Sequence, residues 1–175
     1  MVNFLYRIFL AFNSTFLIVV IYLIKEKYSL NFLKDYSIYL SWLLFILIPI
    51  LLTRLSFGIA KTLANDSLSN TSVVEVELAN NSFLPTYLGY FFVSLGVSDI
   101  PTLIVVFIII YLFTFLSQSL YFNPIFLLFG YQFYFLKTTS NIKVFLISKK
   151  ELKKPGDDGF SNLKRINNYT FIDFE

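Results

Sequence analysis

The chain of 175 residues is 57% hydrophobic, only 14% of its residues are charged, and its net charge is +3. Soluble domains average about 25% charged residues, so this composition indicates an integral membrane protein. Cysteine and histidine are absent, which excludes disulfide bonds, thiol and imidazole catalysis and the usual zinc and haem ligands, and we expect no cofactor.

The first apolar segment covers about residues 4–24 and is followed by the charged run Lys25-Glu26-Lys27. A membrane-spanning helix needs about 20 apolar residues, and no small-residue cleavage site follows the segment, so we interpret it as an uncleaved span. Asn13, Ser14 and Thr15 fall at its middle, where polar groups prefer another helix to lipid. We predict that Asn13 makes a helix–helix contact, and a pore-lining or ligand-binding role is the alternative.

The second apolar segment, about residues 38–60, is a further predicted span, with Lys61 at its end. The longest polar connection follows it, at residues 62–81. Within this connection, Val73 to Leu78 alternates between apolar and polar residues, which predicts a half-exposed strand. Glu75 and Glu77 lie on one face of that strand, where we expect pairing with lysines of the C-terminal tail rather than cation binding.

Residues 82–97 are uncharged but amount to only about 24 Å of helix. A short third span and a re-entrant segment both fit this length, and we predict a span. Gly89 and Gly96 are seven residues apart on one helical face, and we assign them to a helix–helix contact. Ser98 or Asp99 is expected to cap the following helix. We interpret Asp99 as a cap at the membrane interface, and an ion or ligand site is the alternative.

No charged residue occurs between Ile100 and Leu136. A single helix of this length would extend roughly 55 Å, far beyond the hydrocarbon layer of about 30 Å. We therefore predict a fourth span over residues 100–122 and a helix break at Asn123, Pro124 and Gly130.

The tail changes character beyond residue 131. Tyr131 to Leu136 and Lys143 to Ser148 are rich in aromatic and β-branched residues and flank a polar turn, which predicts a β-hairpin. Asn168 to Phe174 alternates again and predicts another strand. Together with Val73 to Leu78 these segments are sufficient for a small sheet outside the membrane.

The distribution of basic residues places the tail in the cytoplasm, because eight of the 14 Lys and Arg residues follow residue 136. Three-span and four-span arrangements place equal numbers of basic residues on the cytoplasmic side, so charge does not distinguish them. The lengths of the apolar segments favour four spans. The sequence thus predicts an α-helical integral membrane protein with four transmembrane helices and both termini cytoplasmic. Residues 1–130 form the bundle, and a small cytosolic β-rich element combines the 62–81 loop with the tail, residues 131–175.

Nothing in the sequence indicates catalysis, since it contains no nucleophile–base arrangement, glycine-rich phosphate loop or carboxylate cluster at metal-ligand spacing. We expect a protein that is not an enzyme. The tail carries six basic residues that we assign to contact with a partner or with lipid headgroups: Lys149, Lys150, Lys153, Lys154, Lys164 and Arg165.

Four motifs from residue 82 onward resemble the membrane subunit of the Kiwa anti-phage defence system: Phe83-Leu84-Pro85-Thr86-Tyr87, Leu120-Tyr121-Phe122-Asn123-Pro124, Phe129-Gly130-Tyr131-Gln132-Phe133-Tyr134 and Asn168-Tyr169-Thr170-Phe171-Ile172-Asp173. They are packing and turn motifs rather than catalytic signatures. The resemblance implies a four-span protein of the bacterial inner membrane that forms homo-oligomers and works with a soluble, DNA-associated cytosolic partner. Our leading hypothesis is a non-enzymatic sensor or scaffold of that defence complex; a pore-forming or transport subunit is the alternative.

Overall fold

The computed structural model describes residues 2–33, 35–68, 73–82, 84–117, 123–155 and 160–174. They divide into two compact units. We call Phe9–Leu55 with Phe83–Asn123 the helix unit, and Met1–Ile8 with Ser56–Ser82 and Pro124–Glu175 the sheet unit.

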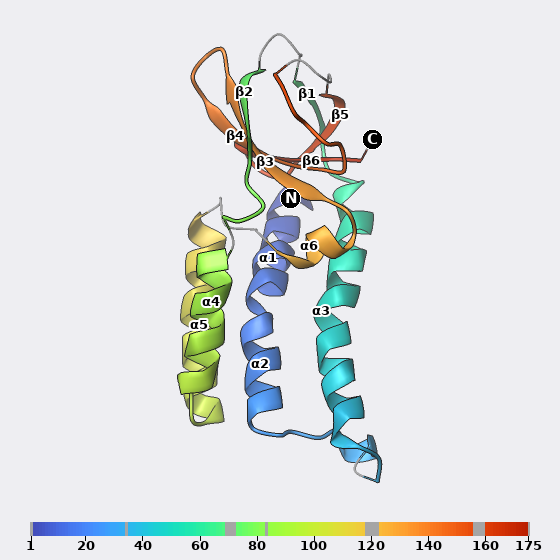
Figure 1. The fold of residues 1–175 in the computed structure, drawn as a ribbon, viewed down its shortest axis with the longest axis vertical. Helices are drawn as coiled ribbons and strands as arrows, with labels where there is room; N and C mark the ends of the chain where they lie inside the picture. Colours follow the sequence, from blue (N-terminus) through green and yellow to red (C-terminus); the bar gives the residue numbers. More distant parts are fainter. Residues whose placement is uncertain are drawn as a thin grey trace. The chain divides into compact units, whose positions relative to one another are not determined.

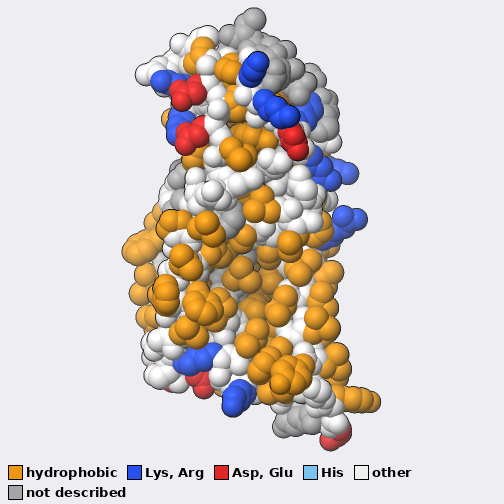
Figure 2. Space-filling model, in the orientation of Figure 1, with side chains coloured by type: hydrophobic (Ala, Val, Ile, Leu, Met, Phe, Trp, Pro, Cys, Tyr) orange, Lys and Arg blue, Asp and Glu red, His pale blue; other side chains and the backbone are white. Residues whose placement is uncertain are grey.

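The helical elements include three stretches that are long and apolar enough to cross a membrane. These are α1 with α2 (Val2–Thr15 and Leu17–Lys25), α3 (Ile38–Ala60) and α5 (Ile100–Ser117). The shorter helices are η1 (Asn31–Leu33), α4 (Leu84–Gly96) and α6 (Ile125–Leu128). With 13 residues, α4 is shorter than the predicted third span, so length and composition alone support three spans. Figure 2 shows hydrophobic side chains over most of the visible surface of the helices.

The first stretch is interrupted between α1 and α2, at Phe16. The hydroxyl groups of Ser14 and Thr15 donate to the carbonyl oxygen of Ala11, at 2.9 and 3.0 Å. Hydroxyls that bond back to the preceding turn often bend helices. Two of the three polar side chains at the middle of this stretch are therefore satisfied within their own helix.

In the helix unit, α4 packs against α2 and α5. Ile18, Tyr22, Tyr90, Val97 and Leu103 form its buried apolar cluster. Ser94 Oγ of α4 donates to the carbonyl of Ile18 at 3.0 Å, and the hydroxyls of Tyr90 and Thr114 are 3.2 Å apart.

The sheet has six strands in the order β1-β5-β6-β4-β3-β2 (Figure 1). The strands are β1 (Asn65–Leu68), β2 (Val73–Leu78), β3 (Gln132–Thr138), β4 (Lys143–Ser148), β5 (Phe160–Arg165) and β6 (Thr170–Asp173). All neighbouring pairs are antiparallel except β4 and β6, which are parallel. The predicted strand at Val73–Leu78, the hairpin and the strand near the end of the chain are confirmed, whereas β1, β5 and the parallel pair were not predicted.

Both faces of the sheet are packed. One face holds an apolar cluster made of Val73, Tyr134, Leu136, Val144, Leu146, Phe160, Leu163 and Phe171, against which Leu152 packs. On the other face, Phe133 stacks on Phe145 with ring centroids 5.7 Å apart and contacts Phe126 of α6. Phe57, near the end of α3, contacts Phe126 at 5.0 Å. The ends of apolar helices therefore form part of the core of the sheet unit.

Candidate interaction surface

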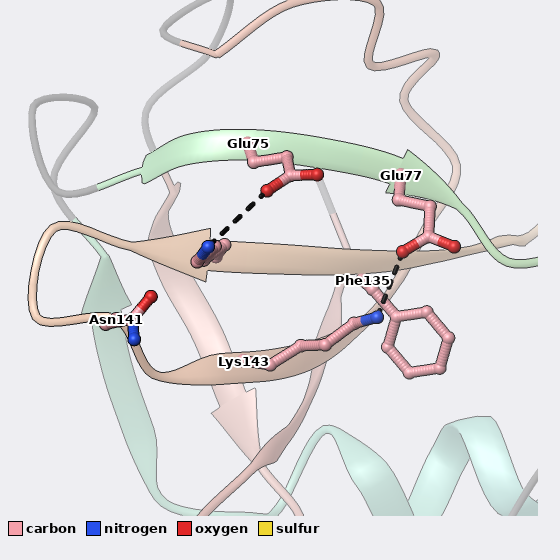
Figure 3. A pocket seen from close by; sticks show the side chains of 6 residues that line it. Glu75, Glu77, Phe135, Asn141 and Lys143 are labelled. Atoms are coloured by element: carbon pink, nitrogen blue, oxygen red, sulfur yellow. Dashed lines mark hydrogen bonds and ion pairs between the residues drawn. The ribbon is translucent and has the colours of Figure 1, made fainter.

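A hollow of about 190 Å³ lies on strands β2, β3 and β4 (Figure 3). It is lined by Glu75, Glu77, Phe135, Lys137, Asn141 and Lys143. Strand alternation explains the grouping, because the register pairs Glu75 with Lys137 and Glu77 with Phe135, and so points these side chains to one face. We call these six residues the charged hollow.

Two cross-strand ion pairs define the charged hollow. Lys143 Nζ is 3.0 Å from Glu77 Oε2, and Lys137 Nζ is 3.9 Å from Glu75 Oε2. The Lys143 ammonium also lies 4.1 Å from the centroid of the Phe135 ring. The predicted pairing of both glutamates with tail lysines is confirmed. Exposed pairs of this kind contribute little to stability.

The six tail residues assigned to partner or lipid contact do not form one patch. Lys164 and Arg165 are consecutive in β5 and point to opposite faces. Lys164 donates to Asn65 Oδ1, whereas Arg165 forms an ion pair with Asp66 at 2.6 Å. Lys153 and Lys154 are exposed, and Lys153 is 3.9 Å from Glu151.

Lys150 has a different role from its neighbours because it faces a buried carboxylate. The Asp173 side chain is only 1% exposed, accepts a hydrogen bond from Ser148 Oγ at 2.9 Å and lies 3.9 Å from Lys150 Nζ. Tyr134 Oη donates to the Lys150 carbonyl and fixes the same segment. Sequence reasoning missed Asp173, because a single acid in an alternating segment gives no indication of burial.

Tyr131 lies beside this carboxylate. Burial, and to a lesser extent the charge of Asp173, raise the pKa of Tyr131 to about 12. Its ring stacks on Phe57 at 4.7 Å, and the Lys149 ammonium lies 5.0 Å from its centroid.

A buried polar cluster joins α1 to α3 in the helix unit. The side-chain amide of Asn13 donates to Thr53 Oγ1 at 2.8 Å, and that of Asn123 donates to the same oxygen at 3.1 Å. Thr53 Oγ1 in turn donates to the carbonyl of Pro49. All three side chains are 1% exposed or less. Thr53 was not singled out from the sequence, although a polar residue within an apolar segment is the feature that could have identified it.

The predicted glycine contacts and the predicted helix break lie in different surroundings. A Cβ atom added at Gly89 or Gly96 would meet no atom within 4 Å. Pro124 immediately precedes α6, and Gly130 follows it with φ +79°. The Gly130 amide donates to Leu127 and that of Tyr131 to Phe126, which ends the helix in the way glycine commonly does.

Asp99 caps α5, as predicted. It accepts hydrogen bonds from the amide and the hydroxyl of Thr102, at 2.8 and 2.9 Å. These bonds hold the pKa of the Asp99 carboxyl below its usual value. Among the described residues, no group of three or more Asp or Glu side chains could hold a metal ion.

A family profile described as anti-phage protein KwaA matches residues 6–172, which is nearly the whole chain. The chain belongs to the KwaA anti-phage protein family. Comparison with curated proteins gave no match, and comparison with solved structures gave none either. Membership of the KwaA family gives this chain a role in anti-phage defence, in the Kiwa context that its motifs had indicated. The match includes most of residues 1–81, where the sequence alone had shown nothing specific to the family.

Proposed function

We propose that this KwaA family protein is a non-enzymatic, four-pass anchor and sensor of the bacterial inner membrane, whose sheet unit recruits a soluble partner in the cytoplasm. The observation that carries the proposal is which parts of the chain supply the strands of the sheet. Strands β1 and β2 precede α4 and α5, strands β3 to β6 follow them, and all six share one sheet. A sheet lies on one side of a membrane, so the chain between β2 and β3 crosses an even number of times.

Contacts within the helix unit support four crossings rather than two. Tyr87 Oη donates to the Ser14 carbonyl, Ser94 Oγ to Ile18 and Lys25 Nζ to Val97. Residue numbers rise together along both segments, so α4 runs parallel to the first stretch and reaches its charged end. If the first stretch crosses the membrane, the link between α4 and α5 lies at the far interface. The helix of α4 covers only about 20 Å, which local thinning of the bilayer can accommodate.

This path is tested with topology reporters. Reporters fused after Lys61 and after Glu175 are expected to be cytoplasmic, and a reporter at Asp35 and one at Ser98 periplasmic. A cytoplasmic signal at Ser98, with the other three as expected, would make α4 and α5 a re-entrant hairpin and refute the four-pass path.

The sensing and recruiting roles fit a protein whose apolar helices continue into the core of its sheet unit. Residues of both α1 and α3 belong to each unit, and Asn3 of α1 donates its side-chain amide to the carbonyl of Arg165 in β5 at 2.8 Å. We infer that a disturbance of the membrane helices reaches the sheet through these helix ends. The polar cluster at Asn13 favours this packing role over a pore, because its amides bond to a buried hydroxyl.

The charged hollow is our proposed partner contact, and its ion pairs permit a sharp test. Exchanging Glu77→Lys together with Lys143→Glu keeps the pair and the net charge but reverses the charges that a partner would meet. The matched control exchanges Asp66→Arg with Arg165→Asp, a cross-strand pair of β1 and β5.

The assay is capture of the soluble partner from detergent extract. The exchange in the charged hollow is expected to abolish capture, and the control exchange to retain it. Normal capture by the first variant, at normal protein levels, would place the contact elsewhere. Self-association, which the family resemblance implies, is a further part of the proposal, with Gly89 and Gly96 as the open helical face.

A further inference from the structure

Two lysines of the sheet unit, Lys61 and Lys149, lie over aromatic rings and form no ion pair within the described part of the chain. Lys137, Lys143, Lys150, Lys153 and Arg165 each have a carboxylate within 3.9 Å. Lys61 and Lys149 are exposed and have no carboxylate partner among the described residues. Their ammonium groups contact aromatic rings instead.

These two lysines flank one pair of rings. Lys61 Nζ lies 5.9 Å from the centroid of Phe174, and Lys149 Nζ lies 5.0 Å from that of Tyr131. The two rings touch edge to face, with centroids 6.2 Å apart. An ammonium over a ring keeps N–H donors that point away from it, so both cations retain donors for an anion. We call Lys61, Tyr131, Lys149 and Phe174 the lysine–aromatic patch.

The position of Lys61 in the chain places this patch at a membrane surface. Lys61 directly follows Ala60, the last residue of α3, and a basic residue at the end of an apolar helix lies at the headgroup level. Lys149 directly follows β4, nearly ninety positions later in the chain, and lies over the Tyr131 ring that contacts Phe174. Tyrosine is a residue typical of this interfacial layer.

We propose that the lysine–aromatic patch binds the phosphate headgroup of an anionic phospholipid in the leaflet on the sheet side. This rests on α3 crossing the membrane, and it is independent of the partner contact at the charged hollow. An anionic lipid is favoured over an acidic protein because the first cation adjoins an apolar span, where headgroup phosphates are the abundant anions. The aromatic rings between the cations suit a layer that is part apolar and part hydrated.

The test uses the purified full-length protein in dodecyl maltoside micelles, titrated with dioleoylphosphatidylglycerol or with dioleoylphosphatidylcholine. Bound lipid is counted by native mass spectrometry, and the shift in Tm is followed in parallel. We expect phosphatidylglycerol to bind and to raise the Tm of the protein. Phosphatidylcholine is expected to do neither. The double variant Lys61→Gln, Lys149→Gln is expected to bind phosphatidylglycerol about 30-fold more weakly. Each basic residue near a membrane surface contributes roughly fivefold to the affinity for an anionic lipid.

Two controls separate charge from position. The variant Lys27→Gln removes one charge from an exposed lysine of the helix unit and is expected to bind as wild type does, so it is the control for Lys149→Gln. The double variant Lys61→Arg, Lys149→Arg keeps the charge and is expected to retain binding. Should the double glutamine variant fail to fold, Lys149→Gln alone is expected to lose about fivefold.

Three results would overturn the proposal. The first is unchanged binding of phosphatidylglycerol by the double glutamine variant. The second is displacement of the lipid by inorganic phosphate at equal concentration, which would make this a site for free phosphate. The third is a double glutamine variant that binds lipid normally but no longer captures the soluble partner, which would make the patch a protein contact. A failed topology reporter with normal lipid binding would instead count against the four-pass path alone.

Discussion

Thr53→Val is the most informative single substitution in the helix unit, because it removes one hydroxyl that serves two amides. The variant keeps the shape of the side chain but leaves the amides of Asn13 and Asn123 without the acceptor they share at 2.8 and 3.1 Å. Hydrogen bonds between membrane helices average about 0.6 kcal/mol and reach about 1.7 kcal/mol. With two such bonds lost, we expect the free energy of unfolding to fall by about 1–2 kcal/mol.

Unfolding by SDS in mixed micelles gives the measurement, followed by circular dichroism and by the fluorescence of Trp42, the only tryptophan in the sequence. Thr62→Val is the control, since that hydroxyl is exposed, follows the end of α3 and bonds locally to the carbonyl of Ile59; we expect a change below about 0.5 kcal/mol.

A double-mutant cycle with Asn13→Leu isolates the bond between α1 and α3. When both partners become apolar, no Asn13 amide is left without its acceptor, and only the bond from Asn123 is still lost. The double variant is therefore expected to be more stable than the sum of the single changes predicts. Strictly additive costs, or a Thr53→Val protein as stable as the Thr62→Val control, would show that this cluster does not hold the two helices together.

Two further predictions concern charges outside the spans. Lys150→Met is expected to cost about 1–3 kcal/mol because it removes a cation that lies 3.9 Å from the buried Asp173 carboxylate, whereas Lys153→Met, whose partner Glu151 is exposed, is expected to be neutral; equal costs in thermal unfolding would refute this difference. The pKa of Asp99 is lowered by its bonds to Thr102, so its contribution to stability is complete above the usual aspartate pKa of about 3.9 and is lost as the pH falls through the lower folded value. Asp99→Asn keeps the cap without the charge, and its Tm is therefore expected to fall less than that of wild type below about pH 4; parallel Tm curves would refute the assignment.

The sequence predicts elements that carry a strong local pattern, and misses those defined by distant contacts. The alternation at Val73–Leu78 and the aromatic hairpin gave β2, β3 and β4 correctly. Strand β5, Phe-Ser-Asn-Leu-Lys-Arg, has only two apolar residues, and β1, Asn-Asp-Ser-Leu, has the composition of a turn. Both are strands because they pair with each other and β5 with β6. Pairing across roughly one hundred residues leaves no periodicity in either segment.

In the candidate sites, too, the features set by a local sequence pattern could be predicted, and those set by distant contacts could not. The pairing of Glu75 and Glu77 with tail lysines could be predicted, because alternation within a strand determines which side chains share a face. The burial of Asp173 and the aromatic surroundings of Lys61 and Lys149 could not. They depend on β6 lying between β4 and β5 and on α3 ending beside Tyr131, which are facts of tertiary structure.

The central place of β6 has a consequence for the synthesis of the protein. Among the six strands β6 is the last to leave the ribosome, yet it lies between β4 and β5 and not at an edge. Until Thr170–Asp173 is made, β1 and β5 have no connection to the rest of the sheet, and the inner edges of β4 and β5 are unpaired. Unpaired edges invite association with other chains. A copy that lacks Thr170–Asp173 would therefore leave its sheet in two pieces, β1 with β5 and β2 with β3 and β4.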